Sequence, residues 1–267
     1  GRHGSRPVHR HPSSHPADHH CGFRRPGVRE LTNLGSAVLD PLLALPSAPR
    51  VTYYDDATGE RIELSTVTLA NWAAKTGNLL RDELGAGPGS RVAILLPAHW
   101  QTLGVILGVW YVGAEVVLGQ DGCDIACCTA ARLDDADAAV GQVGEVVAFS
   151  LDAFGKPVPD LPFGITDYAT SVRVHGDQIA AERSPGPALN GRSVGETLSA
   201  ATNSAASSGL NAASRVLSSA PWDTADDVID HVLAVLVAGG SLVQVSNPDP
   251  ELQARRRDAE KVTAELN

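Results

Sequence analysis

Methionine is absent from this sequence of 267 residues, lysine occurs only three times, and aromatic residues make up only 4%. The longest nearly apolar run, residues 103–118, is interrupted by glycines and by Glu115. It falls short of the roughly 18 apolar residues that a membrane-spanning helix needs, and it predicts a buried helix followed by a strand. No signal peptide is visible, and the absent initiator methionine predicts a fragment or a start site placed too far upstream.

Positive charge is scarce outside the first thirty residues, and the net charge is −10. Residues 1–30 hold six arginines against Asp18 and Glu30, so the rest of the chain is strongly acidic. Because an acidic surface repels phosphate backbones and anionic lipids, we expect neither nucleic acid nor a membrane as a partner. A nucleotide would need a local cradle of backbone N–H groups or a few basic side chains.

Cysteine is also rare, with Cys21, Cys123, Cys127 and Cys128 in the whole chain. Neighbouring Cys127 and Cys128 point to opposite faces of a strand, so they do not readily share a metal site. We interpret the cysteines as small core residues in a reducing cytosol, and we expect a cytoplasmic protein.

The first thirty residues hold six of the nine histidines, together with Pro and Arg and almost no apolar residues. This composition predicts a disordered tail over residues 1–30. Four histidines between His11 and His20 could hold a metal, but Pro12 and Pro16 break any helix that would align them.

Residues 84–118 and 209–245 read as two related strand–helix–strand units. Arg91-Val92 matches Arg215-Val216 with an offset of 124, whereas Gly113 matches Gly239 with an offset of 126, so the second helix region is two residues longer. Two such units predict an α/β fold, a three-layer α/β/α arrangement with two related, mostly parallel sheets. We place this domain at residues 31–267, with a first half at about 31–150 and a second at about 193–267.

Apolar periodicity and turn residues predict the remaining elements. Helices are expected at 34–45 (interrupted by Pro41), after Ser65, and at 99–112, 131–140, 193–210, 224–237 and 251–266. Strands are expected in a hairpin over 49–64 and at 92–96, 115–118, 124–129, 145–150, 168–174, 215–219 and 241–245.

Three segments of the first half carry a family resemblance. Val51-Thr52-Tyr53 opens the hairpin, residues 85–97 read GAGPGSRVAILLP, and residues 113–118 read GAEVVL. In order and spacing they resemble the N-terminal region of the acyl-adenylate-forming superfamily, the AMP-dependent synthetases and ligases, although Ser90 stands where that superfamily has Asp. Residues 209–245 resemble a later segment of the same superfamily.

The resemblance implies a chemistry as well as a fold. Members of this superfamily activate a carboxylic acid with ATP to an acyl-adenylate, then pass the acyl group to coenzyme A or another thiol. It also implies a Ser/Thr/Gly-rich loop with a lysine, whose backbone N–H groups cradle phosphates. The matching stretch, residues 184–198, has neither a Ser/Thr run nor a lysine; it holds Ser184, Gly186, Gly191, Arg192 and Ser193.

Other family features are altered or missing. Arg192 could contact a phosphate, but a lone arginine in a loop is expected to be solvated. The Pro-x-x-His segment of the superfamily reads Pro221-Trp222-Asp223-Thr224, and His231 is expected on a helix face. The adenine-binding segment, the ribose-binding Asp, the hinge and the C-terminal domain with its catalytic Lys have no counterpart.

Other motifs are weak. There is no G-x-S-x-G elbow, and Gly85-x-Gly87-x-Gly89 precedes a strand instead of following one. The acidic clusters at 134–137 and 226–227 fit solvated helix ends. We therefore predict no catalytic, cofactor-binding or metal-binding residue, and no cofactor.

Three functions remain open. The favoured hypothesis is a truncated, non-catalytic or degenerate relative, a pseudoenzyme that binds a partner protein or a small acyl or nucleotide ligand. The alternative is an acyl-adenylate-forming ligase subunit whose C-terminal domain comes from another chain. The third is a structural or regulatory subunit, for which an unpaired sheet edge would favour a protein partner or a homo-oligomer.

Overall fold

The computed structural model describes residue 1 and residues 32–267. Its strands form two five-stranded sheets, sheet A in the order β10-β8-β9-β1-β2 and sheet B in the order β4-β3-β5-β6-β7. In these residues every strand pair is parallel except the hairpin β1–β2. The predicted α/β fold with two mostly parallel sheets is confirmed. The predicted tail, with its histidines and Cys21, lies outside the described residues.

The elements follow the chain in a largely alternating order. The strands are β1 (Pro49–Asp55), β2 (Glu60–Ser65), β3 (Arg91–Leu95), β4 (Glu115–Val117), β5 (Ile125–Thr129), β6 (Glu145–Phe149), β7 (Thr166–Asp167), β8 (Arg215–Ser218), β9 (Ser241–Ser246) and β10 (Ala264–Leu266). The helices are α1 (Leu34–Leu42), α2 (Thr66–Asp82), α3 (Trp100–Tyr111), α4 (Leu133–Val140), α5 (Tyr168–Ser171), α6 (Val194–Ser207), α7 (Ala225–Val228), α8 (Ala234–Val237) and α9 (Pro250–Ala259).

The two repeats fold as equivalent units. Arg91 of β3 lies opposite Glu115 of β4, and Arg215 of β8 lies opposite Ser241 of β9. Gly113 and Gly239 follow their helices with φ of 76° and 84°, a conformation that glycine adopts without steric cost. The second helix is interrupted by a π-helical segment, Ile229–Leu233. A π turn takes up more residues than an α turn, which fits the longer second helix region.

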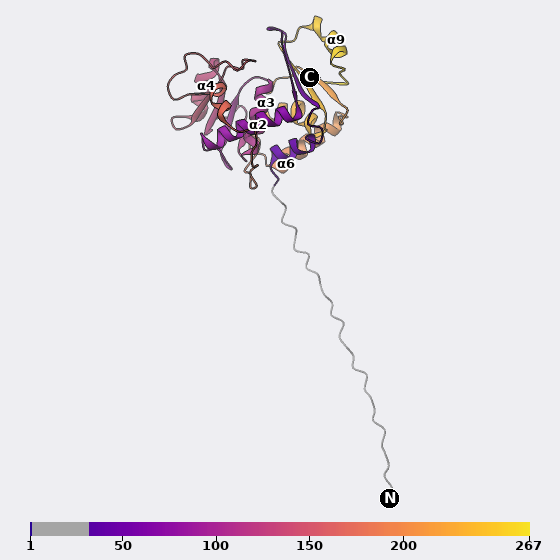
Figure 1. Cartoon of the computed structure of the whole chain (residues 1–267), viewed down its shortest axis with the longest axis horizontal. Helices are drawn as coiled ribbons and strands as arrows, with labels where there is room; N and C mark the ends of the chain where they lie inside the picture. Colours follow the sequence, from indigo (N-terminus) through magenta and orange to yellow (C-terminus); the bar gives the residue numbers. More distant parts are fainter. Residues whose placement is uncertain (2–31) are drawn as a thin grey trace. The chain divides into compact units, whose positions relative to one another are not determined.

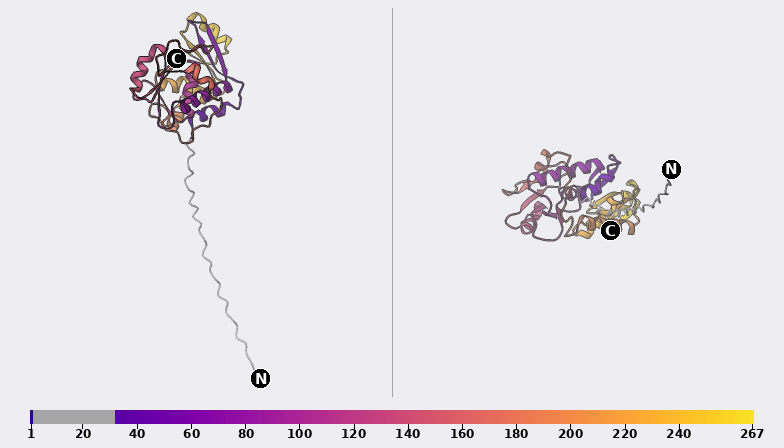
Figure 2. Two further views of the ribbon diagram at one scale, coloured as in Figure 1. Left: turned by 60° about the vertical axis from the view of Figure 1, so that its left-hand side comes forward. Right: turned by 90° about the horizontal axis from the view of Figure 1, so that it is seen from below.

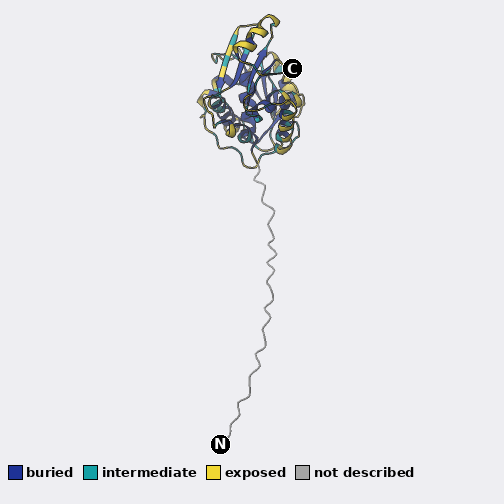
Figure 3. Cartoon of the chain, turned by 90° about the vertical axis from the view of Figure 1, so that its right-hand side faces the viewer, coloured by how far each residue is buried: buried dark blue, intermediate teal, exposed yellow. Residues whose placement is uncertain are grey.

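Helix α3 lies near the centre of the folded part, residues 32–267 (Figure 1). All twelve of its residues are buried, and it contacts β3 and β4 of sheet B as well as β1 of sheet A. In the view from below, Figure 2 shows the magenta-to-pink segments, which include sheet B, and the orange-to-yellow segments, which include β8, β9 and β10 of sheet A, at opposite ends of the folded part. Figure 3 shows the buried residues on the central strands and helices and many exposed residues on the outer helices. The apolar character of 99–112 thus arises from burial on every side.

The hairpin joins the sheet of the second repeat. Val51 of β1 lies opposite Leu242 of β9 in a parallel pair. Buried Arg50 donates from Nη1 to the carbonyl oxygens of Gly239 and Gly240, at 2.8 and 2.6 Å. This long-range pairing was not predicted, because the hairpin sequence carries no signal of which sheet it extends.

Residues 168–174 were predicted as an edge strand, and this was wrong. Strand β7 ends at Asp167, before this range, and α5 and a 3₁₀ turn, Val172–Val174, follow it. The Asp167 side chain accepts the Thr170 backbone N–H at 2.9 Å and so begins a helix. Tyr168 and Val172, one helical turn apart, are both buried, and this pattern is helical.

The final helix was predicted to reach residue 266, and this prediction was wrong for its second half. Helix α9 ends at Ala259, and β10 then adds a parallel strand beside β8. Lys261 has a positive φ of 53°, which turns the chain back, and the Val262 N–H closes the helix end by donating to the Arg257 carbonyl.

Cys127 and Cys128 face opposite sides of β5, in two separate apolar clusters, as predicted. Burial raises the pKa of Cys128 to about 11 and raises that of Cys127 further. Within residues 32–267 no group of three His, Cys, Asp or Glu side chains is placed to hold a metal ion. In the same residues no helix combines the length and apolarity needed to cross a bilayer.

Candidate functional site

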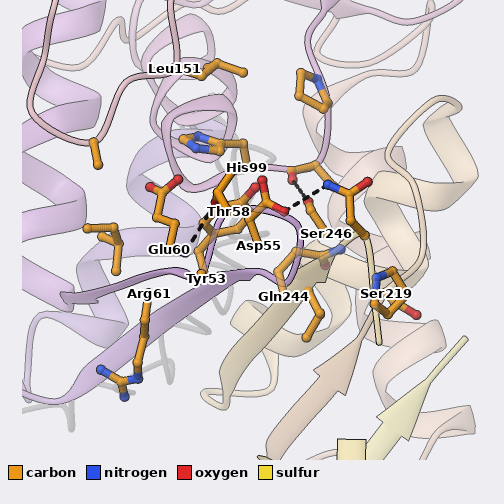
Figure 4. Close-up of a pocket in the computed structure, with 18 of the residues that line it drawn as sticks. Tyr53, Asp55, Thr58, Glu60, Arg61, His99, Leu151, Ser219, Gln244 and Ser246 are labelled. Carbon is orange, nitrogen blue, oxygen red and sulfur yellow. Dashed lines mark hydrogen bonds between the residues drawn. The ribbon is translucent and has the colours of Figure 1, made fainter. Parts of the chain in front are cut away.

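A cleft of about 900 Å³ opens where strands of both sheets end (Figure 4). Residues that follow β3, β6, β8 and β9 line it together with the β1–β2 hairpin. Open α/β sheets bind ligands beyond the carboxyl ends of their strands, because the loops that carry side chains converge there. The volume lies within the range of about 300–1,000 Å³ that is typical of small-molecule sites.

Two buried rings, Tyr53 and His99, line the cleft with their centroids 4.4 Å apart in an edge contact. His99 begins α3, where its Nδ1 accepts the Gln101 backbone N–H at 3.1 Å. Burial lowers the pKa of His99 to about 4 and raises that of Tyr53 to about 12. Both groups are therefore uncharged at neutral pH, and neither has the pKa of an efficient general acid or base.

Burial of His99 makes the stability depend on pH. The unfolded state, with a histidine pKa near 6.5, binds more protons than the folded state between pH 6.5 and 4, so stability falls as pH drops through this window. We expect His99 to contribute a loss of about 2–3 kcal/mol between pH 7 and pH 4.5. Urea unfolding of wild type and His99→Asn, which keeps a helix-capping acceptor, measures this term. Equal losses in both proteins would contradict it.

Negative charge surrounds the cleft. Four carboxylates line it, from Asp55, Glu60, Asp152 and Asp223, against a single guanidinium, from Arg61. Arg61 donates to Glu260 at 2.9 Å and to Glu63 at 3.1 Å, and Figure 4 shows its side chain directed away from His99. The cleft therefore repels phosphates and carboxylates and favours neutral or cationic molecules.

One buried acceptor oxygen in the cleft has no hydrogen-bond partner among the described residues. Gln244 is 1% exposed; its Nε2 donates to the Ala220 carbonyl at 3.0 Å, but its Oε1 is unpartnered. Glu60 faces the indole N–H of Trp100, and burial raises the pKa of Glu60. Since buried polar atoms are normally paired, Gln244 Oε1 is available to a ligand that carries an N–H or O–H donor.

Residues 184–198, which the resemblance matches to a phosphate loop, contain a tight turn. Asn190 and Gly191 have positive φ values of 42° and 81°, and Leu189 bridges Arg192 across them. An Asn-Gly pair with positive φ at both positions is typical of a two-residue type I′ turn. The Asn190 side chain exchanges two hydrogen bonds of 2.8 Å with the Leu118 backbone, which fixes the turn against the end of β4.

The backbone donors of this turn are already used. Every backbone N–H from Gly186 to Ser193 donates within the chain; Pro187 has none. Two of the acceptors are carboxylates. Glu115 Oε1 accepts from Gly191 at 2.5 Å, and Glu196 Oε2 accepts from Ser193 at 2.8 Å in a capping box that begins α6. Negative side-chain charge therefore lies beside these N–H groups and opposes an anion there.

The other residues singled out in the sequence have structural contacts. Arg192 was expected to be solvated; its side chain is 37% exposed and pairs with Asp226 at 2.9 Å. Asp227 closes a capping box with Thr224 at the start of α7. Pro221 and Asp223 line the cleft, whereas Trp222 is buried. His231 lies on the π-helical segment, and its Nδ1 is buried without a partner among the described residues.

No family model matches the chain. A protein of Mycobacterium tuberculosis described as a TIGR03089 family protein is 62% identical over 239 residues, which cover 88% of this chain and 98% of that protein. Solved structures share the fold at low sequence identity. The acyl-CoA synthetase of Brucella canis has a TM-score of 0.71 at 18% identity, over 88% of this chain and 47% of its own.

Two further solved structures are aryl ligases. A benzoate CoA ligase from Burkholderia xenovorans has a TM-score of 0.66 at 14% identity, over 85% of this chain and 48% of its own. The anthranilate CoA ligase AuaEII, in complex with anthranoyl-AMP, has a TM-score of 0.65 at 13% identity, over 80% and 45%. The chain thus spans about half the length of these ligases and has the fold of their N-terminal portion. Its identity to the mycobacterial protein shows that the chain belongs to the TIGR03089 family.

Proposed function

We propose that this protein is a non-catalytic, degenerate relative of the acyl-CoA synthetases that binds a small molecule without negative charge in the cleft. The observation that carries the proposal is the Asn190-Gly191 turn. It lies in residues 184–198, the stretch that the resemblance matches to the phosphate loop. Its two N–H groups already donate within the chain, Gly191 to the Glu115 carboxylate and Asn190 to the Val116 carbonyl oxygen. The acidic lining of the cleft supports the same conclusion, because it opposes a triphosphate.

Glu115 opposes phosphate binding at the turn. This side chain is held between Gly191 N–H and the Arg91 Nε, 3.4 Å away, and the residue is only 6% exposed. A hydrogen bond to a charged group stabilises by about 1.5–3 kcal/mol, so a phosphate at Gly191 would first have to displace this contact. It would then leave two anions side by side in a poorly hydrated place, where like charges repel strongly.

Calorimetric titration with ATP and Mg²⁺ tests the proposal. We expect no binding up to millimolar ATP, and no acid-dependent ATP–pyrophosphate exchange with a mixture of aliphatic and aromatic carboxylic acids. The Brucella canis acyl-CoA synthetase, measured in parallel, is the positive control. Submillimolar ATP binding or exchange by this chain alone would overturn the proposal.

A ligase subunit completed by another chain is the second candidate, since the fold matches less than half of each solved ligase. This function predicts exchange activity in a complex isolated from the native source and none in the chain alone. Absence of exchange in both preparations would leave the non-catalytic function. The buried free thiols of Cys123, Cys127 and Cys128 support a reducing, cytoplasmic location for either function.

A further inference from the structure

A second cavity of about 440 Å³ adjoins the cleft and shares four lining residues with it, Ser150, Asp152, Ala153 and Phe154. Aromatic residues are concentrated around it. Of the chain's four Trp, four Tyr and four Phe, the cavity is lined by Trp72, Trp100, Phe154 and Tyr168. They come from α2, α3, the loop after β6 and α5, so tertiary folding brings them together. We call this cavity the aromatic pocket.

Three of these rings are held by their own contacts. Trp72 and Trp100 meet in a T-shaped pair with centroids 5.5 Å apart. Tyr168 is stacked on Phe149 at 4.1 Å, and its hydroxyl is engaged with Thr76 Oγ1 at 2.8 Å. The rings therefore form a rigid wall whose shape is fixed before a ligand arrives, which reduces the entropic cost of binding.

Phe154 is the exception, because it is 88% exposed. The backbone around it is nevertheless ordered: the Asp152 carboxylate accepts the N–H groups of Phe154 and Lys156, at 2.9 and 3.1 Å. Leu151, at the base of the loop, has a φ of 57°, which is strained for a residue with a side chain. An ordered but uncovered phenylalanine at the mouth of a cavity gains apolar burial only when something covers it.

The chemistry of the walls selects the occupant. The charged side chains that line the aromatic pocket are Asp152 and Arg173, one of each sign, so the pocket favours neither anions nor cations. Aromatic walls favour a flat ring over a saturated one, because rings pair edge-to-face or offset-stacked with additional electrostatic attraction. The volume suits a molecule of one or two rings.

We propose that the aromatic pocket binds a flat, uncharged aromatic group, with Phe154 as its outer wall. This proposal does not depend on whether the chain binds ATP. Its test uses benzamide as the probe and cyclohexanecarboxamide, of nearly equal size and polarity, as the saturated comparison.

The measurement follows the four indole N–H signals of the whole chain by NMR during titration, assigned with Trp72→Phe and Trp100→Phe. Benzamide is expected to shift the Trp72 and Trp100 signals. Phe154→Ala is expected to weaken binding about tenfold, the loss of one aromatic contact and its buried area. Phe163→Ala is the matched control: Phe163 is in the same loop and fully exposed, but it does not line the aromatic pocket.

The saturated amide is expected to bind about two- to tenfold more weakly than benzamide, as ring pairing contributes about 0.5–1.5 kcal/mol. No shift with benzamide at its solubility limit would overturn the proposal. So would equal affinity for the two amides, or equal effects of Phe154→Ala and Phe163→Ala. Tighter binding of benzyltrimethylammonium than of benzamide would also overturn it, because the pocket would then be a cation site.

Discussion

Replacing Asp56 by alanine is expected to destabilise the fold by about 3–5 kcal/mol, because it leaves a buried guanidinium without its partner. The side chains of Arg256 and Asp56 are 6% and 4% exposed, and both Nη atoms of Arg256 donate to Asp56. Asp56 also accepts the Asp249 backbone N–H at 2.8 Å. The pair connects α9 to the turn of the β1–β2 hairpin, so its loss loosens both.

Equilibrium urea unfolding measures this effect, with Asp82→Ala as the matched control. Asp82 pairs with Arg81 at the surface, where the two side chains are 52% and 42% exposed, and we expect a much smaller change than for Asp56→Ala, because solvent screens an exposed pair. In Asp56→Ala/Arg256→Met, no charge is left unpaired, and much of the lost stability should return. If Asp56→Ala and Asp82→Ala behave alike, the buried pair does not stabilise the fold as argued.

Gly108→Ala is expected to cost about 1–3 kcal/mol through crowding between α2 and α3. A Cβ at this position would lie 2.9 Å from the Ala73 carbonyl oxygen and 2.9 Å from the Gly77 nitrogen. Both are backbone atoms of α2, so relief requires the two helices to separate. Because α3 is buried on all sides, that separation would also disturb its contacts with both sheets.

Gly104→Ala, one helical turn earlier in α3, is the matched control. Its Cβ would meet Trp72 Cβ at 3.5 Å, an ordinary contact. Alanine is favoured over glycine in a helix by about 1 kcal/mol, so this variant should be as stable as wild type or more stable. Thermal unfolding of both variants separates crowding from helix propensity, which is the same at the two positions. A stability change of the same sign and size in both would contradict the crowding argument.

The fold could be predicted because its signals are local and occur twice. Arg91-Val92 and Arg215-Val216 mark the first strand of each unit, and Gly113 and Gly239 mark the turn after each helix. The structure gives them equivalent register and equivalent φ. Continuous apolar runs correctly indicated strands and a helix covered on both sides, since burial alone produces such runs.

The cleft could not be predicted in the same way. It is lined by five segments between Tyr53 and Pro248. Some of them belong to the segments of the family resemblance, but nothing in those segments indicates that they meet in one cleft. Tyr53 belongs to the predicted hairpin and His99 to the start of a predicted helix, and nothing in the sequence shows that their rings meet. Likewise Trp72 falls in the helix predicted after Ser65, and nothing in that pattern shows that its ring lines the aromatic pocket. Convergence of distant segments has no sequence periodicity.

Parallel pairing of β1 with β9 has a consequence for biosynthesis. Sheet B is complete once residue 167 has been made, but β1 at residues 49–55 must wait for its neighbour at 241–246. At about 5–20 residues per second, translation keeps the hairpin waiting for on the order of ten seconds or more. Val51 and Tyr53, which end up in the core, lack their β9 neighbours during that interval. The nascent chain is therefore most prone to aggregate after its first sheet has formed and before the ribosome has delivered β9.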